Sequence, residues 1–477
     1  MSNVLHFAKR RGPRPGVLAA SSRAGAACAA PVTPETAASG HAAYAAMHPV
    51  ACALALEGMP AEEVAAALAG LSPENRAETF VHLAPAVQVE VAGGMTRRDL
   101  AALVTEMAPD DRVDLLRHMP EERRDNVLPA LAQAERDDIR RLSSYPEGTA
   151  GSVMTSEYAS LSADMTAEQA IGKLRQEAPD KETIYYAYVV DAGRRLLGQV
   201  SLKDLILARP EARVADIMQR EVVSASVMDD REAAVRKIAQ YDLLALPITN
   251  GGDALVGIIT HDDALDVLHQ EYTEDLEKLM AIGGSHEAGV YLSTSSWTHF
   301  RNRASWIVGL AALGLVSGLI IHRFEDTLMN LLILALYMPM VADTGGNTGS
   351  QSATVVVRAL ALGEIGARDT LRILFKELKV SLLLAGVLGV LSLGKVLFLS
   401  QGDVLPAGMS LLGVGTTIAV ALGLQVVTST LVGAVLPLAA VRCKLDPAVV
   451  ASPALTTVVD ITGLLIYFGT AKLLLGI

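Results

Sequence analysis

Two polar features of this chain lie inside apolar stretches, where polar side chains are costly. One is the segment 339–354, PMVADTGGNTGSQSAT, which follows an uncharged run of almost wholly apolar residues. The other is Asp460, alone among apolar neighbours in the segment 449–475. In a bilayer, non-helical backbone and carboxylates are tolerated only where they are buried in protein or line a water-filled path. The two features together predict a protein that moves something polar across a membrane.

The charges divide the chain into an acidic part and a nearly neutral apolar part. Residues 46–290 carry 42 acidic and 23 basic side chains, whereas the residues from 291 onward carry 9 and 12. This acidity argues against nucleic acid as a partner. It suggests cation binding, although solubility alone explains it equally well.

The beginning of the chain and its cysteines indicate no further chemistry. Residues 1–45 are rich in Ala, Pro, Gly and Ser, which predicts a disordered tail. The basic residues there precede only short apolar runs, so a cleaved signal peptide is not expected. Cys28, Cys52 and Cys443 are too widely spaced for a disulfide framework or a zinc site.

An internal repeat of twelve residues organises the region 46–148. Apolar residues recur at this spacing, and several are followed by Pro and an acidic residue, as in MPAEE at 59 and MAPDD at 107. Pro and acidic residues are favoured in the first turn of a helix. Each unit is therefore expected to be a turn and a short helix, and the units to stack into an all-α superhelix.

A second repeat, at an offset of 64 residues, covers the region 149–268. It pairs Met154 with Met218 and Lys173 with Lys237, and a later offset of 59 pairs Gly198 with Gly257. Each copy predicts strand, helix, two apolar strands and a helix. This order of elements, together with the segments DIMQREVVSAS and LVGIITHDDALDVL, resembles a pair of CBS domains, which commonly bind adenine nucleotides or cations. A purely structural α/β module remains the alternative.

A charged amphipathic helix is predicted over 265–282. Residues 269–300 would therefore link the CBS pair to a membrane domain at 301–477. The linking helix either transmits a signal between them or is a passive connection. The apolar spans there number five, at about 304–323, 327–356, 379–400, 408–440 and 448–475. Basic residues concentrate between spans two and three and between four and five. The positive-inside rule places these loops and the N-terminal region in the cytoplasm, and the C-terminus outside.

The membrane motifs PMVADTGGNTGSQSAT and KLDPAVVASPALTTVVDITGLLIYF, with this order of domains, resemble the MgtE family of magnesium channels. The resemblance covers about residues 46–477. It implies a homodimer in the cell's inner membrane with a pore on the two-fold axis. It also implies that cytosolic Mg²⁺ closes the pore by bridging acidic surfaces of the cytoplasmic domains.

The resemblance assigns pore roles to residues whose chemistry suits Mg²⁺, an ion that prefers oxygen ligands and keeps much of its water. Asp460 resembles the pore aspartate of the family, and Asn347 the pore amide, within a GGN turn that Gly345 and Gly346 allow. Ser452 stands where some members carry Asn, which leaves selectivity at that level open. Asp343 is interpreted either as a residue of the pore mouth or as a helix cap.

The resemblance also assigns carboxylates to a Mg²⁺ sensor, although each of them could equally be a solvated surface charge. These candidate ligands are Asp110 and Asp114 in the helical domain, Asp230, Glu232 and Asp263 in the CBS pair, and Glu271, Glu274 and Asp275 in the linking helix.

The sequence thus predicts a Mg²⁺-gated Mg²⁺ channel and no enzyme, with membrane lipid, divalent cations and a second copy as partners. A cation exporter, or an exchanger coupled to Na⁺ or H⁺, is the main alternative. A nucleotide-sensing receptor is another, but it leaves Asp460 without a role. Whether ATP binds the CBS pair, and whether Co²⁺ or Mn²⁺ replaces Mg²⁺, stays open at this point.

Overall fold

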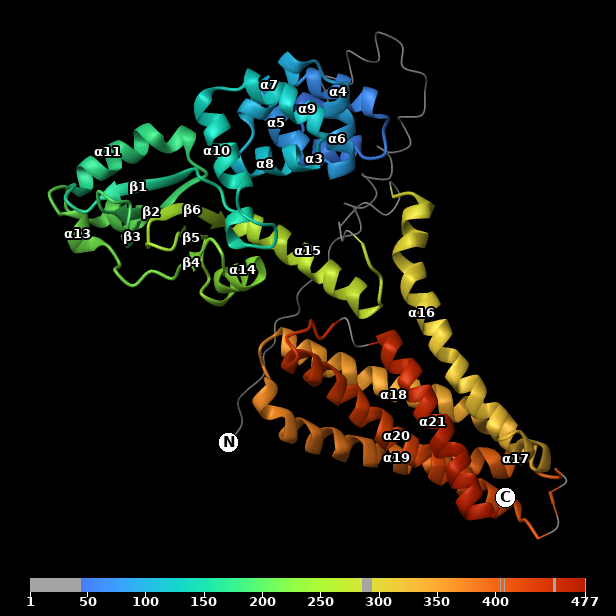
Figure 1. Cartoon of the computed structure of the whole chain (residues 1–477). Helices are drawn as coiled ribbons and strands as arrows, with labels where there is room; N and C mark the ends of the chain where they lie inside the picture. The colour runs from blue at the N-terminus through green and yellow to red at the C-terminus, as the bar shows by residue number, and fades with distance from the viewer. Residues whose placement is uncertain (1–43, 285–293, 404, 407, 449–451, 477) are drawn as a thin grey trace, which may run out of the picture. The chain divides into compact units, whose positions relative to one another are not determined.

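The computed structural model describes residues 44–284, 294–403, 405–406, 408–448 and 452–476. The expected disordered tail thus lies almost wholly outside the described residues. The chain divides into two compact units, one up to Leu268 and one from His269 onward. Figure 1 shows the elements of both.

The first unit begins with an array of short helices that confirms the twelve-residue repeat. Helix starts recur every twelve residues from Pro49 to Gln133, and four of the helices have Pro in their first turn. Each helix packs against the second one after it, so the array is a stacked superhelix. The helices are α3 (Pro49–Leu56), α4 (Ala61–Ala69), α5 (Pro73–Val81), α6 (Pro85–Gly94), α7 (Arg97–Glu106), α8 (Pro109–His118), α9 (Glu121–Val127) and α10 (Gln133–Ser143).

The recurring apolar residue of the repeat lies just before each helix, in the turn. Leu71, Met107, Met119 and Leu131 are all buried in the core of the array. Burial of these side chains stabilises the array by about 25 cal/mol for each Å² of apolar surface that leaves water.

Two three-stranded sheets with the same topology follow, as the offset of 64 predicts. In each sheet the first two strands are parallel and the last two antiparallel. The first copy contains β1 (Tyr158–Ser162), α11 (Ala167–Glu177), β2 (Thr183–Val190), β3 (Leu196–Ser201) and α12 (Leu202–Leu207). The second contains α13 (Val214–Ile217), β4 (Ala225–Ser226), α14 (Arg231–Gln240), β5 (Ala245–Thr249), β6 (Leu255–Thr260) and α15 (His261–Leu279).

The paired residues of the repeat make equivalent contacts. Lys173 Nζ donates to the carbonyl of Ser160 at 2.7 Å, and Lys237 Nζ donates to that of Ser224 at 2.9 Å. Gly198 leaves no room for a Cβ beside Met218, and Gly257 leaves none beside Met154. Each glycine therefore accommodates the methionine of the other copy.

The second unit begins at His269, within α15, and continues as a bundle of long helices. In the part of the chain that the structure describes, four helices are long and apolar enough to cross a membrane: Ser296–Arg323, Thr370–Leu399, Leu411–Arg442 and Pro453–Leu475. A fifth long helix, α18, packs among them but has a polar middle. The helices are α16 (Ser296–Arg323), α17 (Glu325–Asn330), α18 (Ile333–Ala361), α19 (Thr370–Leu399), α20 (Leu411–Arg442) and α21 (Ser452–Leu475).

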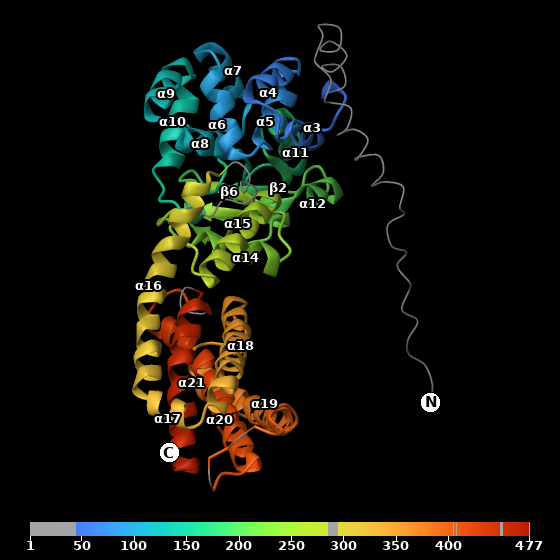
Figure 2. The same cartoon turned by 90° about the vertical axis from the view of Figure 1, so that its right-hand side faces the viewer.

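Helix α20 is the centre of this bundle. It packs against α18, α19 and α21, whereas α16 lies alongside α21 with its apolar surface largely exposed (Figure 2). The fold is therefore a multidomain membrane protein with a helical-repeat superhelix, a CBS pair and an apolar helical domain.

The prediction of a turn at Gly345, Gly346 and Asn347 is wrong, because these residues lie within α18, one continuous helix from Ile333 to Ala361. The glycines serve close packing instead. A Cβ on Gly345 would overlap the side chain of Gln425 on α20, and Gly349 lies against the backbone of α20 at Ser429. Small residues let membrane helices approach one another closely without leaving helical geometry.

Candidate cation pathway and acidic clusters

Helices α18 and α21 present polar side chains next to each other within the membrane unit. Asp343 and Asn347 lie one helical turn apart on an exposed face of α18, and Asp460 is half-buried on α21. Asp343 is close enough for its charge to act on the carboxylate of Asp460. Among the described residues no basic side chain pairs with either carboxylate. Two uncompensated carboxylates beside an amide oxygen form a set of oxygen ligands suited to a hydrated divalent cation.

Helix packing explains how these residues are held. Gly346 faces Thr456 of α21, where an added Cβ would make an ordinary contact of 3.6 Å, and Gly349 lies against Leu455 and Val459. The glycine-rich face of α18 thus runs along the stretch of α21 that leads to Asp460. Of the two readings of Asp343, the helix cap is excluded, because α18 starts well before it at Ile333. Ser452 begins α21, but its side chain lies outside the described part of the structure.

In the first unit, four carboxylates from three elements form what we call the N–CBS cluster: Asp110, Asp111, Glu182 and Asp263. Asp110 and Asp111 lie in the first turn of α8, Glu182 precedes β2, and Asp263 lies in the first turn of α15. The negative charge of Asp263 acts on the other three carboxylates. One oxygen of Asp110 is buried without a hydrogen-bond partner among the described residues. Among the described residues, no salt bridge joins a basic side chain to any of the four carboxylates.

Burial and mutual repulsion both raise the pKa values of this cluster. The pKa of Asp111 and that of Glu182 rise to about 7, in each case through burial first and the charge of Asp263 second. The pKa of Asp263 rises to about 6 through burial, although a hydrogen bond from Thr260 opposes the shift. The pKa of Asp110 lies well above its ordinary value for the same reasons. A bound cation would favour the charged forms and reverse these shifts.

A second group of carboxylates lies at the end of α15, in the second unit. Lys278 Nζ contacts Glu274 at 2.5 Å and Asp446 Oδ2 at 3.0 Å. Burial and the charge of Asp446 raise the pKa of Asp275. Asp446 lies in the loop that connects α20 to α21, so this group connects the linking helix to the helix that carries Asp460.

Several predicted sensor residues have local structural partners. Asp230 caps α14 by accepting a hydrogen bond from Ala233 N at 3.0 Å, and Glu232 pairs with Arg236 on the same helix. Asp114 is 60% exposed and lies 3.6 Å from Arg117. Glu271 lies half-buried on α15, near enough for its charge to act on Asp275.

The structure adds residues that sequence reasoning missed. Asp111, Glu182 and Asp446 join the acidic groups. Gln425 of α20 contacts Val459 on α21 and lies against Gly345 on α18. Asp446 carried a signal, since it is an acidic residue between the basic residues that follow span four and the start of span five. Within the described ranges, no three or more His, Cys, Asp or Glu side chains already converge closely enough to hold one metal ion. The acidic groups are thus looser than a preformed cage.

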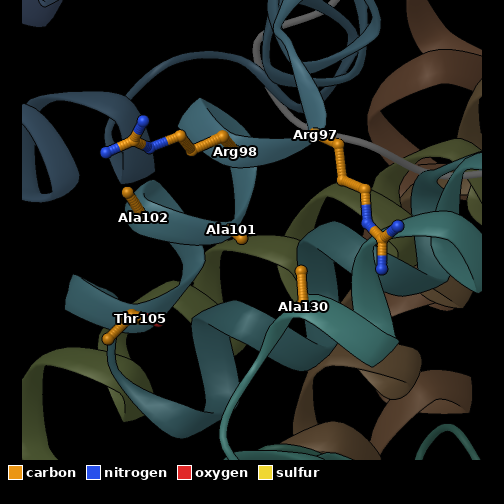
Figure 3. A pocket seen from close by; sticks show the side chains of 6 residues that line it. All are labelled: Arg97, Arg98, Ala101, Ala102, Thr105 and Ala130. Atoms are coloured by element: carbon orange, nitrogen blue, oxygen red, sulfur yellow. The ribbon is translucent and has the colours of Figure 1, made fainter.

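One hollow of the first unit has the wrong chemistry for a cation. It is an open depression of about 510 Å³ on the helical array, lined by Arg97, Arg98, Thr105 and three alanines. Figure 3 shows the two arginine side chains extending away from each other. A basic lining would repel a divalent cation.

Comparison with known proteins identifies the same three parts. A family model described as MgtE, divalent cation transporter, matches residues 338–470. The MgtE intracellular N domain matches residues 47–148, and the CBS domain matches residues 150–211 and 214–270.

Curated relatives match most of the chain. The magnesium transporter MgtE of Thermus thermophilus is 39% identical over 411 residues, which cover 85% of this chain and 88% of that protein. The magnesium transporter MgtE of Bacillus subtilis is 34% identical over 425 residues, with 89% and 91% covered. A solved structure of the cytosolic domain of the Mg²⁺ channel MgtE in complex with ATP is 36% identical, with a TM-score of 0.46 over 48% of this chain and 93% of that one. The chain belongs to the MgtE family of magnesium transporters, which are membrane proteins and not enzymes.

Proposed function

We propose that this magnesium transporter is a homodimeric channel for Mg²⁺ uptake that closes when Mg²⁺ binds its cytoplasmic acidic groups. The observation that carries the proposal is the pair Asp343 and Asp460 beside Asn347, with no basic partner among the described residues. A carboxylate within apolar helices is costly, so its retention without a counter-ion favours a cation as its natural partner.

The pore assignment concerns Asp460, Asn347 and the glycines that hold α18 near α21. Mg²⁺ gives up its water reluctantly, so the ion is proposed to contact Asp460 and Asn347 through water molecules. A two-fold axis through the pore would bring two copies of each residue to the same depth and double the negative charge. Asp343 would add a further pair at the next turn of α18.

The gate assignment rests on the two acidic groups. In the N–CBS cluster, four carboxylates repel one another and their pKa values are raised, so the group is under electrostatic strain without a cation. Mg²⁺ bound between the helical array and the CBS pair would relieve this repulsion and hold the two together. At the end of α15, Lys278 already pairs with Glu274 and Asp446, and Mg²⁺ bound by Asp275 together with these two carboxylates would strengthen the contact with the loop that leads into α21.

The proposed orientation has the first unit and the basic loops in the cytoplasm and the C-terminus outside, following the positive-inside rule. Uptake then needs no hydrolysis, because two positive charges crossing ~100 mV gain about 4–5 kcal/mol.

The test is Mg²⁺ flux in proteoliposomes that contain the purified full-length chain, with a membrane potential as the sole driving force. The proposal expects flux without any Na⁺ or H⁺ gradient, and a decrease in flux as Mg²⁺ on the cytoplasmic side rises. Flux that requires a second ion gradient would instead identify an exchanger on the same fold.

A further inference from the structure

One buried amide connects the two segments of the proposed pore. Gln425 lies on α20, is 0% exposed, and is surrounded by core residues such as Leu422 and Val426. Its Nε2 donates a hydrogen bond of 2.9 Å to the carbonyl oxygen of Val459, the residue directly before Asp460. That acceptor fixes the orientation of the amide, because the flipped form would place two carbonyl oxygens against each other.

The amide occupies a slot that only glycines can form. A Cβ on Gly345 of α18 or on Gly463 of α21 would overlap the side chain of Gln425. Gly345 lies two residues before Asn347, and Gly463 lies three residues after Asp460. Gln425 therefore contacts both segments that carry the proposed pore ligands, from the side of the central helix.

Packing alone does not explain an amide at this position. Its Oε1 is buried and has no hydrogen-bond partner among the described residues. A buried polar atom without a partner costs free energy that an apolar side chain of the same shape would not. The carbonyl of Val459 also accepts from Thr462 Oγ1 of its own helix, at 3.1 Å. The turn of α21 at Asp460 is thus held both from within its helix and by α20.

We propose that Gln425 is a positioning residue that sets the distance between Asn347 and Asp460, and thereby the affinity and selectivity of the pore for Mg²⁺. This inference rests on the proposed function of Asp460 as a pore ligand. A hydrated ion is bound through water, so a small change in the spacing of its two protein ligands alters how well their oxygens match its hydration shell.

The test replaces Gln425 by Met, which keeps the length of the side chain and removes the donor. The matched control is Thr430→Val, because Thr430 is also buried on α20, but among the described residues its hydroxyl donates only to the carbonyl of Val426 on its own helix, at 2.7 Å. Mg²⁺ flux in proteoliposomes is measured against Mg²⁺ concentration, with and without competing Na⁺. Gln425→Asn, which shortens the side chain and withdraws the amide, serves as a milder variant if Gln425→Met yields too little folded protein.

We expect Gln425→Met to raise the half-saturating Mg²⁺ concentration by about tenfold and to weaken discrimination against Na⁺. Thr430→Val should leave both unchanged. A merely structural role would lower the maximal flux through loss of folded protein and leave the half-saturating concentration unchanged, and this result would overturn the inference.

Asp460→Ala is measured in parallel. If the Asp460→Ala variant conducts like the wild type, the assignment of Asp460 to the pore is wrong. If it is silent while both Gln425 variants keep the wild-type half-saturation, only the positioning role fails.

Discussion

Lys278 Nζ lies 3.0 Å from Asp446 Oδ2, and this ion pair ties the end of α15 to the loop that enters α21. Glu274 contacts the same ammonium group from α15 itself. Partial burial alone would lower the pKa of Lys278, but the hydrogen bonds and charges of these two carboxylates outweigh it and raise the pKa above its ordinary value, so the lysine stays charged at physiological pH. The lysine is thus a fixed positive charge among carboxylates that are proposed to bind Mg²⁺.

Replacing this lysine should weaken the coupling between the linking helix and the pore helix. Lys278→Met leaves Glu274 and Asp446 without their shared cation, so they repel each other. We expect a channel that stays partly open at cytoplasmic Mg²⁺ concentrations that close the wild type, measured as residual flux in proteoliposomes. The control is Lys203→Met, an exposed lysine of α12. Equal closure of the Lys278 variant and the wild type would show that the ion pair has no part in the gate.

The N–CBS cluster should release protons when Mg²⁺ binds. Folding raises the pKa values of Asp111 and Glu182 to about 7, above the range near 4 of free carboxylates. The folded cluster therefore holds protons that the unfolded chain has lost, and its contribution to stability declines as pH rises from about 4 through about 7. Mg²⁺ should displace these protons near pH 7 and raise the melting temperature more at pH 8 than at pH 5.

Proton release is measured by titration calorimetry in buffers of different ionisation enthalpy. Asp263→Asn should reduce it, because Asp263 acts on the other three carboxylates of the cluster. Asp204→Asn is the matched control, since Asp204 is hydrogen-bonded to Ser201 in the first CBS copy as Asp263 is to Thr260 in the second. Mg²⁺ binding without proton exchange in the wild type would contradict the account of this cluster.

Mg²⁺ should also protect the cytoplasmic part from protease. Neutralising five carboxylates together, with Asp230→Asn, Glu232→Gln, Glu271→Gln, Glu274→Gln and Asp275→Asn, should reduce that protection and leave the channel open at high Mg²⁺. The Asn at 230 retains an oxygen that can cap α14, so the CBS fold should persist. Identical digestion of the wild type with and without millimolar Mg²⁺ would remove the basis of the sensor.

Much of the fold was predictable because it depends on local patterns. The twelve-residue spacing of apolar residue, Pro and acid fixes where each helix of the array begins. The repeat of Met154 at Met218 and of Gly198 at Gly257 predicts two copies of one α/β module. Both patterns use residues near in sequence or equivalent in a repeat, so they can be recognised without coordinates.

The site was less predictable, because the role of each of its residues depends on neighbours from other helices. Gly345 is compatible with a turn or with close helix packing, and only the position of Gln425 on α20 distinguishes the two. Asp111 and Glu182 look like ordinary surface charges until the fold brings them near Asp263. Asp446 gains its partner Lys278 from a helix more than a hundred and fifty residues earlier in the chain.

The functional unit should be a dimer, because five long helices with one set of pore residues make a poor closed pathway alone. Light scattering of the full-length chain in detergent should give the mass of two copies. The same sample, reconstituted, should conduct Mg²⁺. A monomer that conducts in bilayers would contradict the proposed two-fold pore.

The central claim is that Asp460 supplies the charge that a hydrated divalent cation needs within the membrane. Mg²⁺ flux in proteoliposomes tests it most directly. Asp460→Ala should abolish flux while the protein remains folded and dimeric. Asp460→Asn keeps the shape but loses the charge, so it should weaken selection for divalent over monovalent ions, and Asp460→Glu should retain partial flux with altered affinity. Wild-type flux in Asp460→Ala would contradict the claim, and the path would then have to be sought around Asn347 and Asp343.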